Sequence, residues 1–327
     1  MRILAAVDKF RGTATAAEVA EAIATAATAA GHTCDRCPVS DGGEGWLEAF
    51  GGPNRYNVVT GPLGDPVEAP WRMTGSTAVI EMAQASGLLL AGGADGNDPM
   101  AASTTGTGEL IDAALDCGAK RIIVGLGGSA TTDGGFGAIR AIRHKARLRG
   151  VELLVACDVR TLFTDAAPVF GPQKGASPAQ VALLRGRLER LIQVYAEEFS
   201  VDVGAVEGSG AAGGLAGGLV ALGARLVPGF ELLTDELGVE ERVSQADLVI
   251  TGEGFLDEQS FEGKVVGGVQ ALALAAWVRV VSIAGAVYVG VGDRIEAISL
   301  VERFGEHRSM TETAACIEQA VTELLGA

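Results

Sequence analysis

The chain of 327 residues is poor in positive charge, histidine and aromatic side chains. It holds 25 Lys+Arg against 41 Asp+Glu, a formal net charge of −16, with 3 His and 5% aromatic residues. Proteins that bind nucleic acid neutralise its phosphates with a surplus of Lys and Arg, so this balance argues against a nucleic-acid partner. The three histidines lie far apart in the sequence, which argues against a His-dependent triad or a His-rich zinc site.

Cysteine and long apolar runs are also scarce. Five Cys in a chain of this length do not form a disulfide scaffold. Cys34 and Cys37 match C-x-x-C, but Pro38 follows where a redox motif would open a helix, so we expect buried or loop thiols. The apolar run at the N-terminus is too short for a signal peptide, and the uncharged stretch 208–224 is too short and too rich in Gly and Ala for a membrane span. We therefore expect a cytoplasmic protein with no membrane partner.

Glycine and short apolar runs are abundant instead. Gly accounts for 47 of the 327 residues, and 48% of the chain is hydrophobic. Apolar runs alternate with segments of helical period along most of the chain. The runs predict buried strands at 3–7, 122–126, 153–156, 248–251 and 280–284, and the segments predict helices at 16–30 and 108–117. This alternation is typical of a parallel sheet covered by helices on both faces.

Residues 56–82 differ, because turns rather than helices join their strand-like runs. A chain of this length also favours two domains. We therefore predict an α/β protein with a Rossmann-like parallel-sheet domain made of residues 1–54, 97–150 and 244–327. A smaller mixed α/β domain, made of residues 55–96 and 151–243, is inserted in it.

Glycine and aspartate cluster just after the predicted strands. In open α/β sheets ligands bind beyond the carboxyl ends of the strands, so these turns are the expected site. The first turn, residues 8–13, carries Asp8 and Arg11 and suits a charged ligand. The second precedes a short helix, and its glycines let backbone N–H groups approach a ligand closely. Its candidate residues are Ser40, Asp41, Gly42 and Gly43.

The third turn, residues 125–135, is the richest of them. Backbone amides, three hydroxyl groups and the start of a helix predict an anion cradle. The sequence does not match the G-x-x-x-x-G-K-[ST] phosphate loop. The candidate binding residues of this turn are Gly127, Gly128, Ser129, Thr131 and Asp133.

Two further turns carry acidic and basic side chains. Asp158 is a candidate base or metal ligand, with a helix cap as the alternative, and Lys174 is a candidate partner for an anion. Glu253 and Asp257 offer carboxylates for Mg²⁺, and Lys264 at a helix start is within reach of a phosphate. A solvated acidic loop is the alternative for this last turn.

One motif matches a known pattern without the structural context that the pattern requires; we call it the fingerprint decoy. Residues 208–213 fit the dinucleotide fingerprint G-x-G-x-x-G, but the preceding residues 200–207 contain Asp202, Gly204 and Glu207 and make a poor buried strand. We therefore disfavour a dehydrogenase. The turns also show no pair of a nucleophile and a base, which favours phosphoryl transfer over covalent catalysis.

These turns, in this order, resemble the class I glycerate kinase family. The resemblance covers nearly the full length and is carried by residues 8–13, 40–45, 97–111, 127–135, 155–159, 170–176, 210–214 and 246–264. It implies ATP-dependent phosphorylation of D-glycerate with Mg²⁺, mainly to 2-phosphoglycerate. It also implies a two-domain α/β fold with the active site in the cleft between the domains.

The acidic turns suggest roles for that reaction. We predict Asp158 or Asp41 as the general base and Glu253 and Asp257 as the Mg²⁺ ligands. Arg11, Lys174 or Lys264 would pair with the carboxylate of glycerate or with the phosphates. A homodimer stays open.

The chain departs from the family pattern after Gly137. Residues 138–151 are shorter than the usual segment and basic, which suggests either an anion patch or a solvated helix face. The shortening also leaves open a kinase for another small hydroxy acid, or a regulator that binds nucleotide or glycerate without catalysis.

Overall fold

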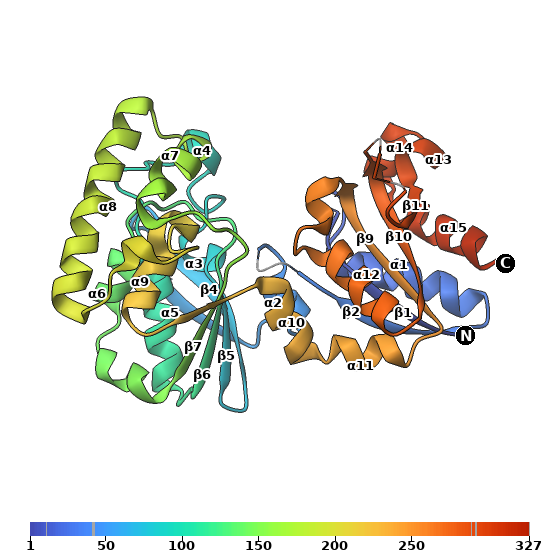
Figure 1. Cartoon of the computed structure of the whole chain (residues 1–327), viewed down its shortest axis with the longest axis horizontal. Helices are drawn as coiled ribbons and strands as arrows, with labels where there is room; N and C mark the ends of the chain where they lie inside the picture. Colours follow the sequence, from blue (N-terminus) through green and yellow to red (C-terminus); the bar gives the residue numbers. More distant parts are fainter. Residues whose placement is uncertain (11, 41–42, 289, 292, 327) are drawn as a thin grey trace. The chain divides into compact units, whose positions relative to one another are not determined.

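The computed structural model describes residues 1–10, 12–40, 43–288, 290–291 and 293–326 (Figure 1). The predictions made for Arg11, Asp41 and Gly42 therefore lie outside the described residues. The chain divides into two compact units. Unit 1 contains residues 1–41 and 230–327, and unit 2 contains residues 42–229. Unit 2 is therefore one continuous insertion between the two segments of unit 1.

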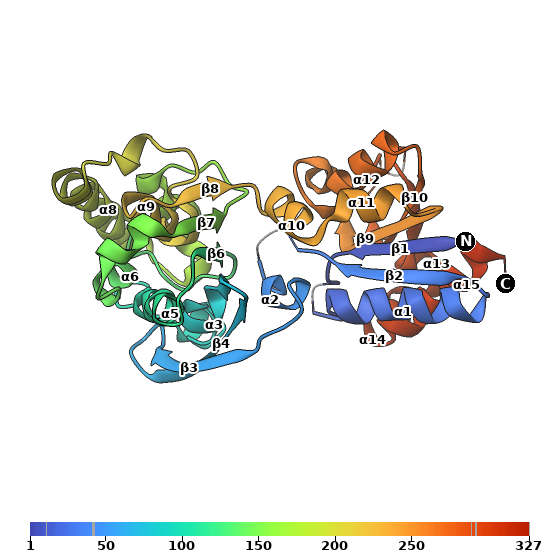
Figure 2. The same ribbon diagram turned by 90° about the horizontal axis from the view of Figure 1, so that it is seen from below.

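Unit 1 is built on a parallel sheet. Its order is β11-β10-β9-β1-β2, with the strands β1 (Arg2–Val7), β2 (Thr33–Pro38), β9 (Leu248–Leu256), β10 (Arg279–Val287) and β11 (Glu296–Ser299). Figure 2 shows helices on both faces of this sheet. They are α1 (Ala16–Ala29), α10 (Gly229–Leu237), α11 (Val239–Ser244), α12 (Val265–Ala275), α13 (Leu300–Phe304), α14 (Glu306–Thr311) and α15 (Thr313–Leu325). The predicted Rossmann-like parallel sheet is confirmed.

The start of α1 shows how local sequence determines where a helix of unit 1 begins. Thr15 Oγ1 accepts a hydrogen bond from the Glu18 N–H, and Glu18 Oε2 accepts one from the Thr15 N–H, which closes a capping box. The apolar face of α1 then packs with α15 against β1, β9 and β10, where Val19, Ile23 and Ile317 are fully buried. This packing holds the strands whose carboxyl ends carry the first and fifth predicted turns.

Unit 2 is built on a mixed sheet in the order β3-β4-β5-β6-β7-β8. Its strands are β3 (Arg55–Thr60), β4 (Pro66–Thr74), β5 (Thr77–Glu81), β6 (Arg121–Gly125), β7 (Glu152–Ala156) and β8 (Arg225–Val227). The pairs β3–β4 and β4–β5 are antiparallel, whereas β5 to β8 are parallel. The predicted strands joined by turns over 56–82 are therefore confirmed.

Helices of unit 2 pack on this sheet and beside it. The core that joins α5 and α9 to β5, β6 and β7 includes Leu110, Ile122, Val155 and Leu219. A second core lies between α7 and α8. The helices are α2 (Trp46–Ala49), α3 (Ala83–Ser86), α4 (Gly93–Gly96), α5 (Thr105–Asp116), α6 (Phe136–Ala141), α7 (Ala166–Phe170), α8 (Pro178–Phe199) and α9 (Leu215–Ala221).

The structure groups the chain differently from the predicted boundaries. Residues 97–150 belong with 55–96 and 151–229, because β6 is hydrogen-bonded between β5 and β7 in one sheet. The inserted unit is also the longer of the two units rather than the smaller. An apolar strand such as β6 fits the interior of either sheet, so its sequence does not reveal its neighbours.

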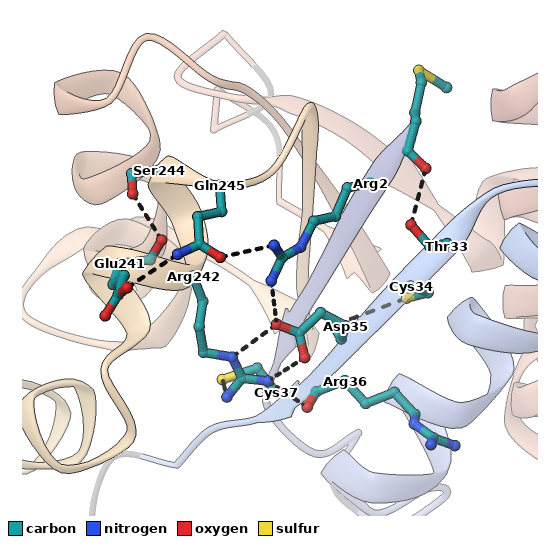
Figure 3. A network of polar contacts seen from close by, with 11 residues as sticks. Arg2, Thr33, Cys34, Asp35, Arg36, Cys37, Glu241, Arg242, Ser244 and Gln245 are labelled. Atoms are coloured by element: carbon teal, nitrogen blue, oxygen red, sulfur yellow. Dashed lines mark hydrogen bonds and ion pairs between the residues drawn. The ribbon is translucent and has the colours of Figure 1, made fainter.

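The C-x-x-C motif lies on β2, which the sequence did not predict as a strand. Side chains three residues apart on a strand point to opposite faces, so Cys34 and Cys37 do not form a disulfide. Figure 3 shows that β2 is instead tied to α11 by Arg242, whose Nη2 lies 2.7 Å from Asp35 Oδ1 and whose Nη1 lies 3.0 Å from Cys37 Sγ. Burial raises the pKa of the Cys37 thiol to about 11, which disfavours a thiolate.

Within the described ranges, none of the helices combines the length and the apolar character that a membrane crossing requires.

Candidate active site

The candidate site of unit 2 begins at the carboxyl ends of three parallel strands. Ile80 of β5, Val124 of β6 and Val155 of β7 lie in register, so the loops after these strands leave the sheet at the same edge. The loop after β6, residues 126–135, contains the glycines and hydroxyl groups of the predicted anion cradle. The loop after β7 contains Asp158.

The tip of the loop after β6 is bare backbone. A Cβ at Gly127 would lie 2.3 Å from the Gly43 Cα, and Gly128 has a φ of +75°. The second and third predicted turns therefore contact each other within unit 2, and glycine is required at their contact. Among described residues, the N–H groups of Gly127, Gly128 and Ser129 donate no hydrogen bond. Their donors are available to an anion.

Lys174 lies behind this tip. Its side chain is 2% exposed, and its Nζ lies 2.8 Å from Ser129 Oγ and 2.6 Å from the carbonyl oxygen of Thr131. The amide of Asn97 adds a second tie, because Nδ2 donates to the carbonyl oxygens of Ala130 and Lys174. The segments carrying Lys174 and Asn97 thus hold the loop from within the unit.

Burial also changes the acidity of this lysine. It lowers the pKa of Lys174 to about 7, against the opposing effect of the Asp133 charge. Within the part of the chain that the structure describes, no carboxylate forms an ion pair with the Lys174 ammonium. Ser129 and Lys174 therefore place a hydroxyl group and an amine within hydrogen-bond distance of each other. The sequence, in which the turns show no pair of a nucleophile and a base, did not reveal this contact.

Asp133 anchors the other end of the loop. Its Oδ2 accepts hydrogen bonds from the N–H groups of Thr104 and Gly137, and its Oδ1 accepts one from the Gly135 N–H. Thr104 Oγ1 also donates to this carboxylate, at 2.8 Å from Oδ2. These donors give Asp133 a structural role between α5 and α6, and its direct contact with a ligand stays a prediction.

Asp158 has a helix partner. Its Oδ1 lies 2.8 Å from the N of Gly229, the first residue of α10, and accepts its hydrogen bond. This is the helix-cap role that the sequence left open. The geometry leaves the role of Asp158 as a general base a prediction.

The candidate site of unit 1 lies where β9 continues past β1. Val7 pairs with Gly252, so Glu253 follows at the level of Asp8, whose N–H donates to the Gly252 carbonyl oxygen. Lys264, the residue before α12, lies near enough to act electrostatically on Glu253. The first and fifth predicted turns therefore meet at one edge of the unit 1 sheet.

Glu253 is the unusual group of this edge. Its Oε1 is buried without a hydrogen-bond partner among described residues, and burial raises its pKa to about 7. Asp257 is a cap, since its Oδ1 accepts the Ser260 N–H. The described residues contain no group of three or more His, Cys, Asp or Glu side chains placed to hold a metal ion. Mg²⁺ is usually held by one or two carboxylates plus phosphate oxygens, so Glu253 and Asp257 fit such a site.

Ser40 follows β2, two residues after its last residue Pro38, in the same unit. Its side chain is 1% exposed, and its Oγ has no partner among the described atoms. The structure therefore places Ser40 in the interior.

The fingerprint decoy has a structural role. The segment directly before residues 208–213 is not a strand but a short 3₁₀ helix, Val203–Ala205, followed by a turn. A Cβ at Gly213 would lie 1.9 Å from the carbonyl oxygen of Thr131. This segment therefore supports the predicted anion cradle by close backbone packing instead of binding a dinucleotide.

The shortened basic segment is partly neutralised within unit 2. Arg143 contacts both Asp112 and Asp116 of α5, and Arg147 contacts Asp116 at 2.7 Å. These ion pairs attach the segment to α5. Neither of the two interpretations drawn from the sequence, an anion patch and a solvated helix face, included such an attachment. A groove of about 580 Å³ beside them is lined by Glu109, Asp112, Asp116 and Arg143, and two of its three carboxylates are paired with that arginine.

Sequence reasoning missed two residues that shape the site. Asn97 ties segments 33 and 77 residues away, and Thr104 holds Asp133 over 29 residues. Both lie in the part of the chain, residues 97–111, that carries the resemblance, which is the only sequence signal for them. Pairing over such distances is not visible in local patterns.

Comparisons with known proteins agree with the resemblance. The model described as "Glycerate kinase family" matches residues 3–146 and 143–326, two stretches that meet in the basic segment. The chain is 41% identical to "Glycerate 2-kinase" of Escherichia coli, over 89% of this chain and 87% of that protein. It is 40% identical to "Glycerate kinase" of Bacillus subtilis, over 88% and 85%.

A solved structure is similar over the whole chain. The crystal structure of putative glycerate kinase 2 from Salmonella typhimurium LT2 matches with a TM-score of 0.86 and 34% identity, covering 100% of this chain and 97% of that one. The α/β fold, the ordered turns and these relatives lead to one assignment. The chain belongs to the glycerate kinase family and is a phosphotransferase enzyme.

Proposed function

We propose that the enzyme transfers the γ-phosphoryl group of ATP to the 2-hydroxyl group of D-glycerate. The observation that carries this proposal is the loop after β6, where free backbone donors at Gly127 and Gly128 are backed by the buried Lys174. A bare glycine tip at a strand end suits a phosphate group. The name of the Escherichia coli relative, glycerate 2-kinase, supports the 2-hydroxyl group as the acceptor.

In this proposal the chain supplies position and charge. The N–H groups of Gly127, Gly128 and Ser129 hold the terminal phosphate oxygens, and Asn97 and Lys174 fix the loop from behind. Such donors are worth most when they are already oriented before the substrate arrives. The ties at both ends of the loop give that orientation.

A carboxylate takes the proton of the attacking hydroxyl group. Asp158 and Asp41 remain the two candidates, and a positioned base contributes roughly 10²–10⁴-fold to the rate. Asp8, Arg11, Ser40 and Lys264 remain predicted contacts of the substrate or its phosphates.

Glu253 and Asp257 would hold Mg²⁺. When bound, the cation offsets negative charge on the phosphate oxygens. Without it, Glu253 keeps an oxygen buried with no partner among described residues, which favours its protonated form.

A second candidate is phosphorylation of another small hydroxy acid. The segment after Gly137 is short and bound to α5 through Arg143 and Arg147, and this departure from the family pattern favours a test of the acceptor. The active site between the two domains, the cytoplasmic location and a homodimer also remain predictions.

The test is an ADP-release assay across a panel of hydroxy acids, with the phosphate position in the product read by NMR. We expect D-glycerate to give the highest kcat/KM, with phosphate on carbon 2. ADP release with a different acid alone would favour the second candidate, and binding of ATP without any release would indicate a regulator. Asp158→Asn and Asp41→Asn decide the base, because the variant that keeps wild-type kcat is removed from that role.

A further inference from the structure

Ser129 and Lys174 form a pair that the proposed direct transfer does not use. They are 45 residues apart in the sequence, yet the Lys174 Nζ lies 2.8 Å from the Ser129 Oγ. A hydroxyl group within hydrogen-bond reach of an amine, with the amine oriented by a third group, is the arrangement of an activated nucleophile. The third group here is the carbonyl oxygen of Thr131, which accepts a hydrogen bond from the same Nζ at 2.6 Å.

The surroundings of Lys174 favour the neutral amine that this chemistry needs. Its two hydrogen-bond partners are uncharged, and the side chain is 2% exposed. Among the described residues, the carboxylate that acts on its charge is that of Asp133, whose oxygens already accept hydrogen bonds from Thr104, Gly135 and Gly137. Once Nζ loses a proton, one N–H continues to donate to the Thr131 carbonyl oxygen and the lone pair accepts the Ser129 hydroxyl hydrogen.

The pair lies directly under the predicted phosphate contact. Gly128 is exposed, the next residue Ser129 is 9% exposed, and Lys174 beneath it is almost fully covered. Ser129 therefore joins the exposed glycine tip to the buried amine. A phosphate held by the Ser129 N–H would lie beside the hydroxyl group of the same residue.

We infer that Ser129 is a phosphoryl acceptor, activated by Lys174, that takes the γ-phosphoryl group of bound ATP when no hydroxy acid is present. In the step, the Ser129 Oγ forms a bond to the γ-phosphorus, and the bond from that phosphorus to the bridging oxygen of ADP breaks. The electron pair of the broken bond leaves with ADP, and the hydroxyl proton moves to the Lys174 Nζ. This inference rests on the proposed use of ATP.

A purely structural tie makes the opposite prediction. If Lys174 only holds the loop, the Ser129 Oγ stays an acceptor of the ammonium and is not a nucleophile. The protein then carries no phosphate after incubation with ATP. The two accounts therefore differ in a covalent product, which does not depend on turnover of an acceptor.

The experiment incubates the full chain with Mg²⁺ and γ-labelled ATP in the absence of any hydroxy acid. We expect acid-stable label and a mass gain of one phosphoryl group, mapped by peptide mass spectrometry to Ser129. Ser129→Ala removes the label at this peptide. Lys174→Met, which keeps the length of the side chain but removes the amine, slows labelling by about 10²–10⁴-fold.

Ser209→Ala is the matched control. Ser209 is likewise a serine of unit 2 with little or no exposure, but its Oγ has no hydrogen-bond partner among described residues. Labelling of this variant should equal that of the wild-type protein. If Lys174→Met does not fold, as judged by circular dichroism, mapping of the wild-type label and the Ser129→Ala variant still decide the proposal.

The outcomes separate the two proposals. A protein that releases ADP with D-glycerate but shows no label on Ser129 overturns the inference and leaves the proposed function intact. Label on Ser129, with no further ADP release when any hydroxy acid is added, supports the inference and overturns the proposed function. Label on other residues only also overturns the inference.

Discussion

The carboxyl ends of the strands in the two sheets present groups of opposite electrostatic character. In unit 2 the loop after β6 is tied at both ends, by Asp133 on one side and by Lys174 and Asn97 on the other, and it presents free N–H donors. In unit 1 the part of β9 that continues past β1 presents Glu253, a carboxylate with an unpartnered buried oxygen among the described groups. The first edge suits an anion and the second suits a cation or a proton.

The two edges differ in electrostatic character because different charged groups lie next to them. Unit 2 places an amine under its loop, whereas unit 1 places Asp8 beside Glu253. A nucleotide bound with a metal ion needs both kinds of contact. The following variants test the comparison, from the largest expected effect to the smallest.

Lys174 gives the largest effect, on stability as a function of pH. Its native pKa of about 7 lies below that of an unfolded lysine, about 10.4, so between these pH values the unfolded state binds more protons. Stability therefore rises with pH in this window, by up to about 1.4 kcal/mol per pH unit relative to Lys174→Met. Below about pH 7 the difference does not change with pH.

Urea unfolding of both proteins at a series of pH values measures this slope. The charged group facing Lys174 is Asp133, and Ser129 and Thr131 are its neutral partners. Equal slopes for the two proteins would show that the amine stays protonated in the native state.

Gly127→Ala tests the contact between the two turns of unit 2. The new Cβ would lie 2.3 Å from the Gly43 Cα, so the turns must separate. We expect kcat/KM to fall about 10²-fold, because misplacement of a phosphate contact by about 1 Å costs that much.

Gly186→Ala is its control. Gly186 lies within α8 with no atom within 4 Å of the added Cβ, so we expect stabilisation by about 0.5–1 kcal/mol and unchanged kcat/KM. Full activity of Gly127→Ala would contradict the prediction that the tip of the loop after β6 must lack a side chain at residue 127.

The sequence predicted much of this arrangement. Apolar runs ending in Gly or Asp located the ends of β1, β6 and β7, and the glycine content of the loop after β6 indicated an anion site. The end of β9 was missed, because this strand continues to Leu256 through residues predicted as a turn. The Ser129–Lys174 pair was not predictable, because contacts across 45 residues depend on how β6 and the later turn are folded together. The position of β6 in the inserted unit was missed for the same reason.

Arg242→Leu tests how firmly unit 1 holds the strand that leads to Ser40. Arg242 donates to both oxygens of Asp35 and to the Arg36 carbonyl oxygen (Figure 3). Hydrogen bonds to charged groups contribute about 1.5–3 kcal/mol, so we expect a loss of about 2 kcal/mol in the urea unfolding of unit 1.

Arg279→Leu is the matched variant. It removes a similar two-point contact with Glu296, but that pair is more than half exposed. Exposed pairs contribute about 0–1 kcal/mol. Equal losses for the two arginines would contradict the special role of the contact between β2 and α11.

Glu253→Gln gives the smallest effect, on the metal dependence of the reaction. It removes the charge that suits a cation, so we expect the half-saturating Mg²⁺ concentration to rise about tenfold. Glu258→Gln, an exposed carboxylate of the same turn, should leave this concentration unchanged. An equal shift in both variants would indicate a general effect of charge rather than a ligand.

The position of the terminal phosphate tests the central claim most directly. It is measured in a crystal structure of the protein with Mg²⁺ and a non-hydrolysable ATP analogue. We predict that the γ-phosphate oxygens accept hydrogen bonds from the N–H groups of Gly127, Gly128 and Ser129, with the Lys174 amine behind them. A terminal phosphate bound away from this loop would contradict the account.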